Sequence, residues 1–174
     1  LCLGRRKSRK NKMINISANK IKIAIGCDHA GFELKEKLIS KYHNYTFSDY
    51  GTFSNNSVDY PDFGHAVGLA VNENKVDFGI VICGSGIGIS IAANKIKDIR
   101  AALCSTVEHA RLSRLHNNAN VLALGSRLTH EKDIYNIIDA FLNTKFEGGR
   151  HLDRIKKIGS YKKWKILLVK ILKY

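Results

Sequence analysis

Several features are scarce in this 174-residue chain, and each scarcity excludes a class of protein. The four cysteines form no CxxC pair and show no zinc-ligand spacing, so the sequence indicates neither a disulfide scaffold nor a structural zinc site. Proline occurs once, and no repeat or low-complexity linker divides the chain. No apolar run reaches the roughly 20 residues of a bilayer span, and no apolar stretch of the kind found in secretion signals follows the basic start. We therefore expect a cytoplasmic protein.

Acidic residues are missing from both ends of the chain. The net charge is +14, yet residues 1–22 carry eight Lys/Arg and residues 155–174 carry seven, with no acid in either segment. The remaining body, 23–154, holds 14 basic and 15 acidic residues, a net charge of −1. The basicity therefore belongs to the two ends, and an ordinary balance of charge belongs to the body.

We divide the chain into a basic N-terminal extension at 1–20, expected to be non-native or disordered, one domain at 21–158, and a basic tail at 159–174. Because Met13 is the sole methionine, we expect translation to start there, or the chain to be processed or truncated. Basic tails can bind nucleic acid or acidic membranes, but a solvated extension is the simpler interpretation. We expect no nucleic-acid or membrane partner, although 164–172 is interpretable as an amphipathic helix on a membrane surface or against a partner subunit.

Short apolar runs alternate with longer amphipathic segments through the body. Strands are expected at 21–26, 45–50, 78–83, 100–104 and 120–124, and helices at 31–43, 61–74, from the turn 84–88 to about 96, 106–115, 130–143 and from about 150. This alternation predicts a single-domain α/β fold with a doubly wound, Rossmann-like, five-stranded parallel sheet. Ligands of such sheets bind at the carboxyl ends of the strands, where Asp28-His29, Cys83–Gly88 and Arg127 fall.

The most informative segment is the glycine-rich turn Cys83-Gly84-Ser85-Gly86-Ile87-Gly88. Its glycines let the backbone approach an anion, but the spacing is neither GxGxxG nor a P-loop. A thiol at the start of a helix tends toward thiolate character, which suits a nucleophile or a base. A buried structural thiol is an equally good interpretation of Cys83 from spacing alone.

Three other segments carry side chains that chemistry could use. Asp28 and His29 could bind sugar hydroxyls and phosphate, or could be a helix cap and a surface histidine. His116, in a loop before a strand, could act as an acid or base near neutral pH, or could simply be solvated. Arg150 and Arg154 lie four residues apart on one expected helix face, which suits phosphate but is also common on helices.

Taken together, these segments resemble the type B ribose-5-phosphate isomerase family, which also includes galactose-6-phosphate isomerase subunits. The matching segments are GCDHAGFELK (26–35), DYGT (49–52), DYP (59–61), ICGSGIGISIAANK (82–95), IRAALC (99–104), LSRLHNNANVLALGSR (112–127) and FEGGRH (146–151). The resemblance spans about 21–158. It departs at Ser85, where many members have Thr, and the hydroxyl is retained.

The resemblance implies a role for each matching residue. It implies that Cys83 moves a proton between C1 and C2 of the open-chain sugar and that His116 opens the furanose ring. It further implies that the enediolate is bound by Ser85 and the amides of Gly84, Gly86, Ile87 and Gly88, sugar hydroxyls by Asp28 and Asn117, and phosphate by His29, Arg127, Arg150 and Arg154.

The implied activity is interconversion of ribose 5-phosphate and ribulose 5-phosphate in the non-oxidative pentose phosphate pathway. The resemblance implies no metal or other cofactor. It implies a homo-oligomer, a dimer or a tetramer, in which the arginine pair reaches the neighbouring subunit's site. The alternatives are a galactose-6-phosphate or allose-6-phosphate isomerase and a non-catalytic sugar-phosphate binding protein.

Overall fold

The computed structural model describes residues 20–159. The expectations for Met13, for nearly all of the N-terminal extension and the C-terminal tail, and for the helix at 164–172 lie outside the described residues. Within them the elements are β1 (Lys22–Cys27), η1 (His29–Gly31), α1 (Phe32–Lys41), β2 (Thr46–Asp49), α2 (Tyr60–Asn72), β3 (Phe78–Cys83), α3 (Ile87–Ala93), β4 (Ala101–Leu103), α4 (Val107–Asn117), β5 (Val121–Gly125), α5 (Glu131–Asn143) and α6 (Arg150–Gly159).

The five strands form one parallel sheet in the order β2-β1-β3-β5-β4. The chain passes from β1 to β2 on one side and then crosses to β3 on the other side of β1. The winding direction therefore reverses between β1 and β3, where an α/β sheet of this kind usually binds its ligand. The predicted doubly wound α/β fold is confirmed.

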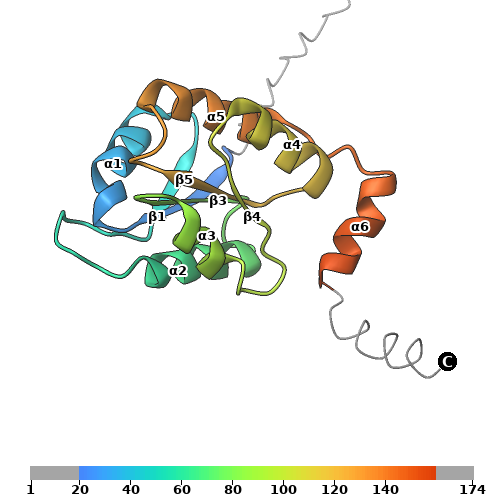
Figure 1. Ribbon diagram of the computed structural model, residues 1–174, viewed down its shortest axis with the longest axis horizontal. Helices are drawn as coiled ribbons and strands as arrows, with labels where there is room; N and C mark the ends of the chain where they lie inside the picture. The colour runs from blue at the N-terminus through green and yellow to red at the C-terminus, as the bar shows by residue number, and fades with distance from the viewer. Residues whose placement is uncertain (1–19, 160–174) are drawn as a thin grey trace, which may run out of the picture.

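Helices cover both faces of the sheet, as Figure 1 shows, with α1, α4 and α5 on one side and α2 and α3 on the other. Alternate residues of the buried strands supply the two cores: Ile80 and Ile82 face the first group of helices, and Val81 and Cys83 face the second. Because both faces are covered, β3 is almost continuously apolar, and only Phe78 at its start is half-buried.

The helices show the sequence signals that begin and orient them. Pro61 lies in the first turn of α2, where its missing N–H costs nothing. The Thr106 side chain accepts a hydrogen bond from the His109 amide and caps α4. The buried residues of α5 recur at the three- and four-residue intervals of one helix face: Ile134, Ile137, Ile138, Phe141 and Leu142.

The last helix, α6, stands apart from the three layers beside the β4 edge in Figure 1. In α6, His151 is the sole buried residue. No helix among residues 20–159 is both long and apolar enough to cross a bilayer.

Candidate active site

A cavity of about 570 Å³ opens at the carboxyl ends of β1 and β3, where the winding reverses. Its wall combines residues of four chain segments: Asp28, Tyr60, Cys83, Gly84, Ser85, Ile87, Gly88, Arg127 and Leu128. Three segments that the sequence singled out separately, after β1, after β3 and after β5, therefore meet at one place. The main-chain bond from the Asp28 amide to the Ile82 carbonyl, 3.2 Å long, holds the first two loops together.

Cys83 is the last residue of β3, and its thiol lies under the turn that follows. The side chain is buried, with 4% of the residue exposed, yet it forms part of the cavity wall. The Gly86 amide donates a hydrogen bond of 3.1 Å to Sγ. This bond holds the sulfur in place beneath the turn that leads into α3.

The other two described cysteines have a different environment. Burial raises the pKa of the Cys27 thiol to about 12 and that of the Cys104 thiol to about 11. Neither residue lines the cavity. Both therefore remain protonated core side chains near neutral pH. Among the cysteines of residues 20–159, Cys83 is the one whose side chain lines the cavity.

The conformation of the turn depends on two of its glycines. Gly86 has a φ of +76°, and a Cβ there would come within 2.5 Å of Leu103 Cδ1 and 2.8 Å of the Leu124 carbonyl carbon. A Cβ on Gly88 would come within 2.5 Å of the Tyr60 ring, so this tyrosine packs directly on the start of α3. Main-chain atoms are thereby left at the cavity wall, where N–H groups can face an anionic ligand.

The carboxylate of Asp28 both caps the short helix η1 and lines the cavity. Its Oδ1 accepts hydrogen bonds from the amides of Ala30 and Gly31, at 3.0 and 3.3 Å. The neighbouring His29 accepts a hydrogen bond from the Val58 amide on Nδ1, at 3.3 Å. The cap that the sequence offered as one interpretation of Asp28 is therefore present, and it fixes the orientation of a carboxylate at the cavity.

Arg127 places a cation at the cavity. Its amide donates to the Gly84 carbonyl at 3.0 Å, and its side chain lies against Gly84. The Ser126 hydroxyl donates to the Ala30 carbonyl at 2.8 Å and so joins this loop to the one after β1. Within residues 20–159 the Arg127 guanidinium makes no hydrogen bond, so its donors are available for an anion.

The remaining predicted site residues lie elsewhere in the chain. The helix α4 ends at Asn117, just before β5 begins at Val121, so His116 and Asn117 lie at the edge where the strands start. Cys83, in contrast, lies where β3 finishes. Arg150 and Arg154 belong to α6, which begins beside the end of α4. One chain therefore does not bring these four residues to the Cys83 cavity.

His116 has two neighbours that sequence reasoning missed, Glu147 and His151. The rings of His116 and His151 stack with centroids 4.3 Å apart and an angle of 8°. A Glu147 carboxylate oxygen lies 3.9 Å from His116 Nε2 and 3.8 Å from His151 Nε2. Burial, followed by the positive charge of His116, lowers the pKa of His151. The sequence signal was the pair Glu147 and His151 at i and i+4, but nothing in it linked that pair to His116.

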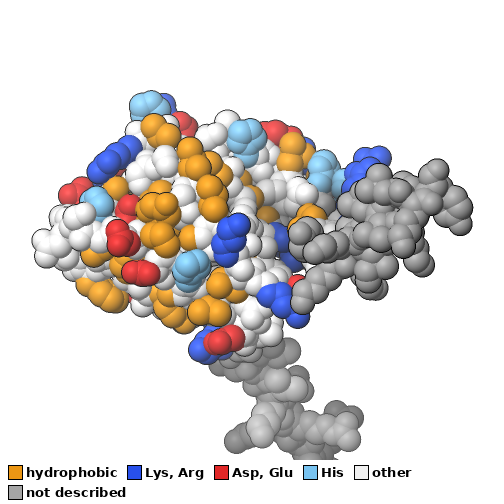
Figure 2. Space-filling view, turned by 60° about the horizontal axis from the view of Figure 1, so that its bottom comes forward, with side chains coloured by type: hydrophobic (Ala, Val, Ile, Leu, Met, Phe, Trp, Pro, Cys, Tyr) orange, Lys and Arg blue, Asp and Glu red, His pale blue; other side chains and the backbone are white. Residues whose placement is uncertain are grey.

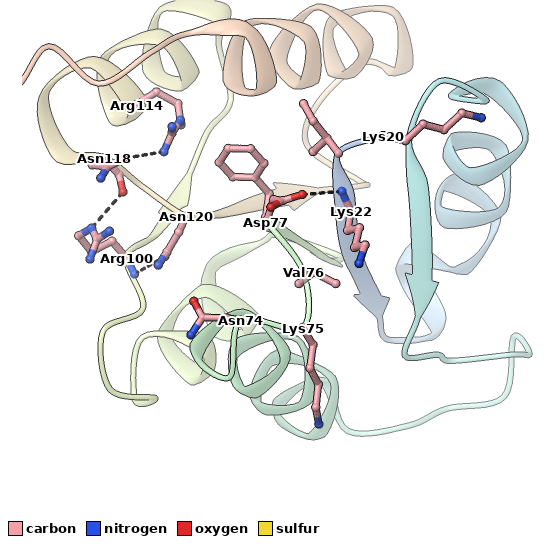
Figure 3. A pocket seen from close by; sticks show the side chains of 12 residues that line it. Lys20, Lys22, Asn74, Lys75, Val76, Asp77, Arg100, Arg114, Asn118 and Asn120 are labelled. Carbon is pink, nitrogen blue, oxygen red and sulfur yellow. Dashed lines mark hydrogen bonds between the residues drawn. The ribbon is translucent and has the colours of Figure 1, made fainter. Parts of the chain in front are cut away.

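A larger cavity of about 740 Å³ lies at the start edge of the sheet (Figure 3). The arginines that line it form hydrogen bonds within the fold. Arg100 donates to the carbonyls of Asn117 and Asn118, and Arg114 donates to the Asn118 side chain and the Ala119 carbonyl. Since these donors already bind carbonyls, this cavity has less capacity for an anion than its charge suggests.

Comparison with known proteins agrees with this geometry. The model of the ribose/galactose isomerase family matches residues 23–158. Ribose-5-phosphate isomerase B of Escherichia coli is 48% identical over 139 residues, covering 79% of this chain and 93% of the relative. The Clostridium thermocellum ribose-5-phosphate isomerase B structure is 50% identical with a TM-score of 0.81, covering 83% of this chain and 99% of that one. The Mycoplasma genitalium ribose-5-phosphate isomerase B structure, with bound ribulose 5-phosphate, is 42% identical with a TM-score of 0.77, covering 82% and 97%.

Proposed function

The chain belongs to the ribose/galactose isomerase family, and from this membership we propose that it interconverts ribose 5-phosphate and ribulose 5-phosphate. The observation that carries the proposal is the position of Cys83. Its sulfur lies at the wall of the cavity where the winding reverses, and it receives an N–H from its own turn. A base beside oriented main-chain donors is what the interconversion of an aldose and a ketose requires.

In the proposed mechanism the Cys83 thiolate removes the proton from C2 of the open-chain aldose. The electrons of that C–H bond form the C1–C2 double bond, and the carbonyl π electrons move to O1 as negative charge. The thiol then returns the proton to C1, while the O2 hydroxyl proton passes to O1 and the carbonyl forms at C2. Atoms and electrons balance without an external oxidant, and the proposal assigns the reaction no metal or organic cofactor.

The turn after Cys83 is proposed to stabilise the enediolate. The Ser85 hydroxyl and the amides of Gly84 and Gly88 lie at the cavity, where preoriented donors stabilise developing charge without reorganising. The Gly86 and Ile87 amides donate to Cys83 Sγ and Ser85 Oγ, so they would have to turn from these partners to bind the enediolate directly. Asp28 is proposed to bind a sugar hydroxyl through its carboxylate. Arg127 is proposed as the phosphate ligand that comes from the same chain, and His29 as its neighbour.

The other proposed roles require a second copy of the chain. His116 as the ring-opening group, Asn117 as a hydroxyl ligand, and Arg150 and Arg154 as phosphate ligands all lie at or near the start edge of the strands, away from Cys83. We therefore propose a homo-oligomer in which this edge of one subunit completes the cavity of its neighbour. In a symmetric dimer, one such contact creates two complete sites.

The surface around the cavity supports this assembly. Tyr60, Ile87 and Leu128 line the cavity and are exposed, and Leu69 and Ile91 extend the apolar surface over α2 and α3. Figure 2 brings the α2 and α3 side forward and shows hydrophobic side chains gathered there. Apolar patches of this kind on a folded chain mark interaction surfaces, and a second copy placed here would also exclude water from the cavity.

The test is a coupled assay of ribose 5-phosphate conversion with Cys83→Ala. We expect turnover to fall by about 100-fold or more, since a positioned general base contributes about 10²–10⁴-fold. Calorimetric binding of ribulose 5-phosphate should persist, because the thiol is not a proposed phosphate ligand. Cys104→Ala removes a buried thiol that does not line the cavity and is the matched control, expected to retain turnover. A Cys83→Ala enzyme with near-normal turnover would remove the proposed base.

The alternative substrates share the chemistry and differ in the length of the sugar. The resemblance implies that galactose-6-phosphate isomerase divides its site residues between unlike subunits, whereas Cys83 and His116 occur together in this chain. This favours the ribose enzyme over the galactose enzyme. A kcat/KM for allose 6-phosphate or galactose 6-phosphate above that for ribose 5-phosphate would overturn the substrate assignment. No turnover of any of the three would favour a non-catalytic sugar-phosphate binding protein.

A further inference from the structure

His116, Glu147 and His151 form a compact cluster of metal-ligating side chains at the start edge of the sheet. One ligand atom from each residue lies within 4.8 Å of the others. The three residues come from separate segments, the end of α4, the connection after α5 and the first turn of α6. The Glu147 amide donates to the Leu115 carbonyl at 3.0 Å, so the backbone holds this connection against α4.

The histidine in α6 provides a second, independent observation. His151 is 4% exposed, and its Nε2 is buried without a hydrogen-bond partner among the described residues. The Glu147 carboxylate, at 3.8 Å, is too far for a hydrogen bond. A buried polar nitrogen without a hydrogen-bond partner lowers the stability of the folded state. A ligand bound between His151 and Glu147 would satisfy it.

Two imidazoles and one carboxylate are the ligand set of many open zinc sites. Imidazole nitrogen also suits nickel and cobalt, whereas magnesium and calcium prefer oxygen ligands. We propose that His116, Glu147 and His151 bind one transition-metal dication of the Zn²⁺ class, leaving a coordination position open. The mechanism proposed above assigns this metal no step. Occupancy instead withdraws His116 from its proposed ring-opening role, so the site is inhibitory.

Binding requires a modest local rearrangement. Ligands about 2.0–2.2 Å from Zn²⁺ lie closer together than the present 3.8 and 3.9 Å separations. The stacked rings also have to turn, because a metal lies in the plane of each imidazole that binds it. His116 has a side chain 37% exposed and can rotate, whereas His151, at 5%, is held by packing. Arg150 and Arg154 lie nearby on α6 and oppose a cation, so we expect moderate rather than tight affinity.

The site is tested by titrating untagged, metal-stripped full chain with Zn²⁺ in a calorimeter. His151→Phe keeps an aromatic ring on His116 but removes the ligand, and Glu147→Gln keeps the size of the side chain but removes the charge. We expect one Zn²⁺ per chain in the wild type and about 100-fold weaker binding in either variant, since even groups behind the ligands contribute about 10- to 100-fold. Unchanged affinity in both variants, or no binding by the wild type, overturns the proposal.

Two control variants exclude other ligands. His43→Gln removes an exposed histidine outside the cluster, and Cys83→Ala removes the thiol at the cavity. Both should bind Zn²⁺ as the wild type does. Affinity lost in Cys83→Ala but kept in Glu147→Gln would assign the metal to the thiol and overturn the proposed site.

The inhibitory effect rests on the proposed function and has its own readout. Zn²⁺ should inhibit ribose 5-phosphate conversion by the wild type, a chelator should restore it, and His151→Phe should resist inhibition relative to its own metal-free rate. Stoichiometric binding without inhibition would support the site and contradict the ring-opening role of His116. Because binding is measured apart from turnover, failure of the site and failure of the proposed function give different results.

Discussion

At the scale of single residues, Asp28 shows how one side chain can serve the fold and the cavity together. One carboxylate oxygen accepts the Ala30 and Gly31 amides, and the residue also lines the cavity beside Cys83. The two interpretations that the sequence left open are therefore compatible. A carboxylate has about four acceptor positions, and the cap uses two of them. The cap orients the group, which is the kind of support that a proposed substrate ligand needs.

Two substitutions of Asp28 separate these contributions. Asparagine caps a helix about as well as aspartate, so Asp28→Asn should leave the free energy of unfolding nearly unchanged, whereas Asp28→Ala should lower it by about 1 kcal/mol. If the carboxylate binds a sugar hydroxyl, both variants should lose kcat/KM for ribose 5-phosphate. Urea unfolding and the coupled assay measure the two effects. Full activity in Asp28→Asn would show that the negative charge of Asp28 is not required for catalysis or substrate binding.

At the scale of elements, hydrophobic periodicity predicted the strands and helices of the body to within a few residues. It succeeded because the strands are buried on both faces and α5 repeats its apolar residues at helical spacing. It could not predict which loops touch. Tyr60 packs on Gly88 because α2 and α3 lie side by side, and no local pattern in the sequence encodes that contact.

The turn between β3 and α3 provides a prediction at this scale. Gly86→Ala should lower the free energy of unfolding by more than about 2 kcal/mol, because an L-residue at positive φ costs about 1–2 kcal/mol and its Cβ also meets Leu124 main chain. The displaced turn should also reduce kcat. Gly148→Ala is the control, since Gly148 has a φ of +74° with nothing within 4 Å. Equal losses of stability in both variants would show that the backbone angle alone matters.

An ion pair with one fully buried partner links α1 to β2. Lys35 is fully buried and pairs with Asp49, whose other oxygen accepts the Gly51 amide at 2.8 Å. Burial alone would lower the pKa of Lys35, but hydrogen bonds from Lys35 to Asp49 and Glu36 outweigh it, so the pKa is raised above its ordinary 10.5. The charged form is therefore favoured by folding.

Lys35→Met should lower the free energy of unfolding by about 1.5–3 kcal/mol at neutral pH, because it removes the charge-assisted hydrogen bonds from Lys35 to Asp49 and Glu36. Since folding raises the pKa of Lys35, the stabilisation is complete below the ordinary value of 10.5 and is lost as pH rises through the higher folded value. The difference between wild type and variant should thus stay constant from neutral pH to about pH 9 and shrink only in strong alkali. Urea unfolding over a pH series measures it.

The matched control for this prediction is Lys37→Met in the same helix. Lys37 pairs with Glu131 at 2.7 Å, but both side chains are about half exposed. Such surface pairs contribute about 0–1 kcal/mol, so the variant should lose little stability. A loss as large as that of Lys35→Met would mean that the burial of Lys35 is not the source of its effect.

At the scale of the whole molecule, the sequence predicted which loops share one edge of the sheet but left the assembly to be inferred. The carboxyl ends of β1 and β3 had to share an edge because parallel strands do, and Asp28 and Cys83 accordingly meet. Spacing could not show that Glu147 and His151 surround His116, because that contact depends on how α4 packs beside the connection after α5. Nor could it give the strand order, in which β5 lies between β3 and β4.

Subunit complementation tests the proposed assembly most directly. Cys83→Ala and His116→Ala should each be nearly inactive alone, since every site lacks either its base or its ring-opening group. If His116 of one subunit completes the cavity of the next, a mixed dimer has one site that retains both residues. Equal amounts unfolded and refolded together give half mixed dimers, so we expect about a quarter of the wild-type activity. Co-refolding Cys83→Ala with Ser85→Ala is the control. Both residues belong to the same turn, so each subunit of this mixed dimer brings one altered turn to its own cavity. No site in the control then has both Cys83 and Ser85 intact, and activity should stay at background. Activity that stays at background in the first mixture, with mixed dimers confirmed by mass spectrometry, would place His116 and Cys83 in separate functions.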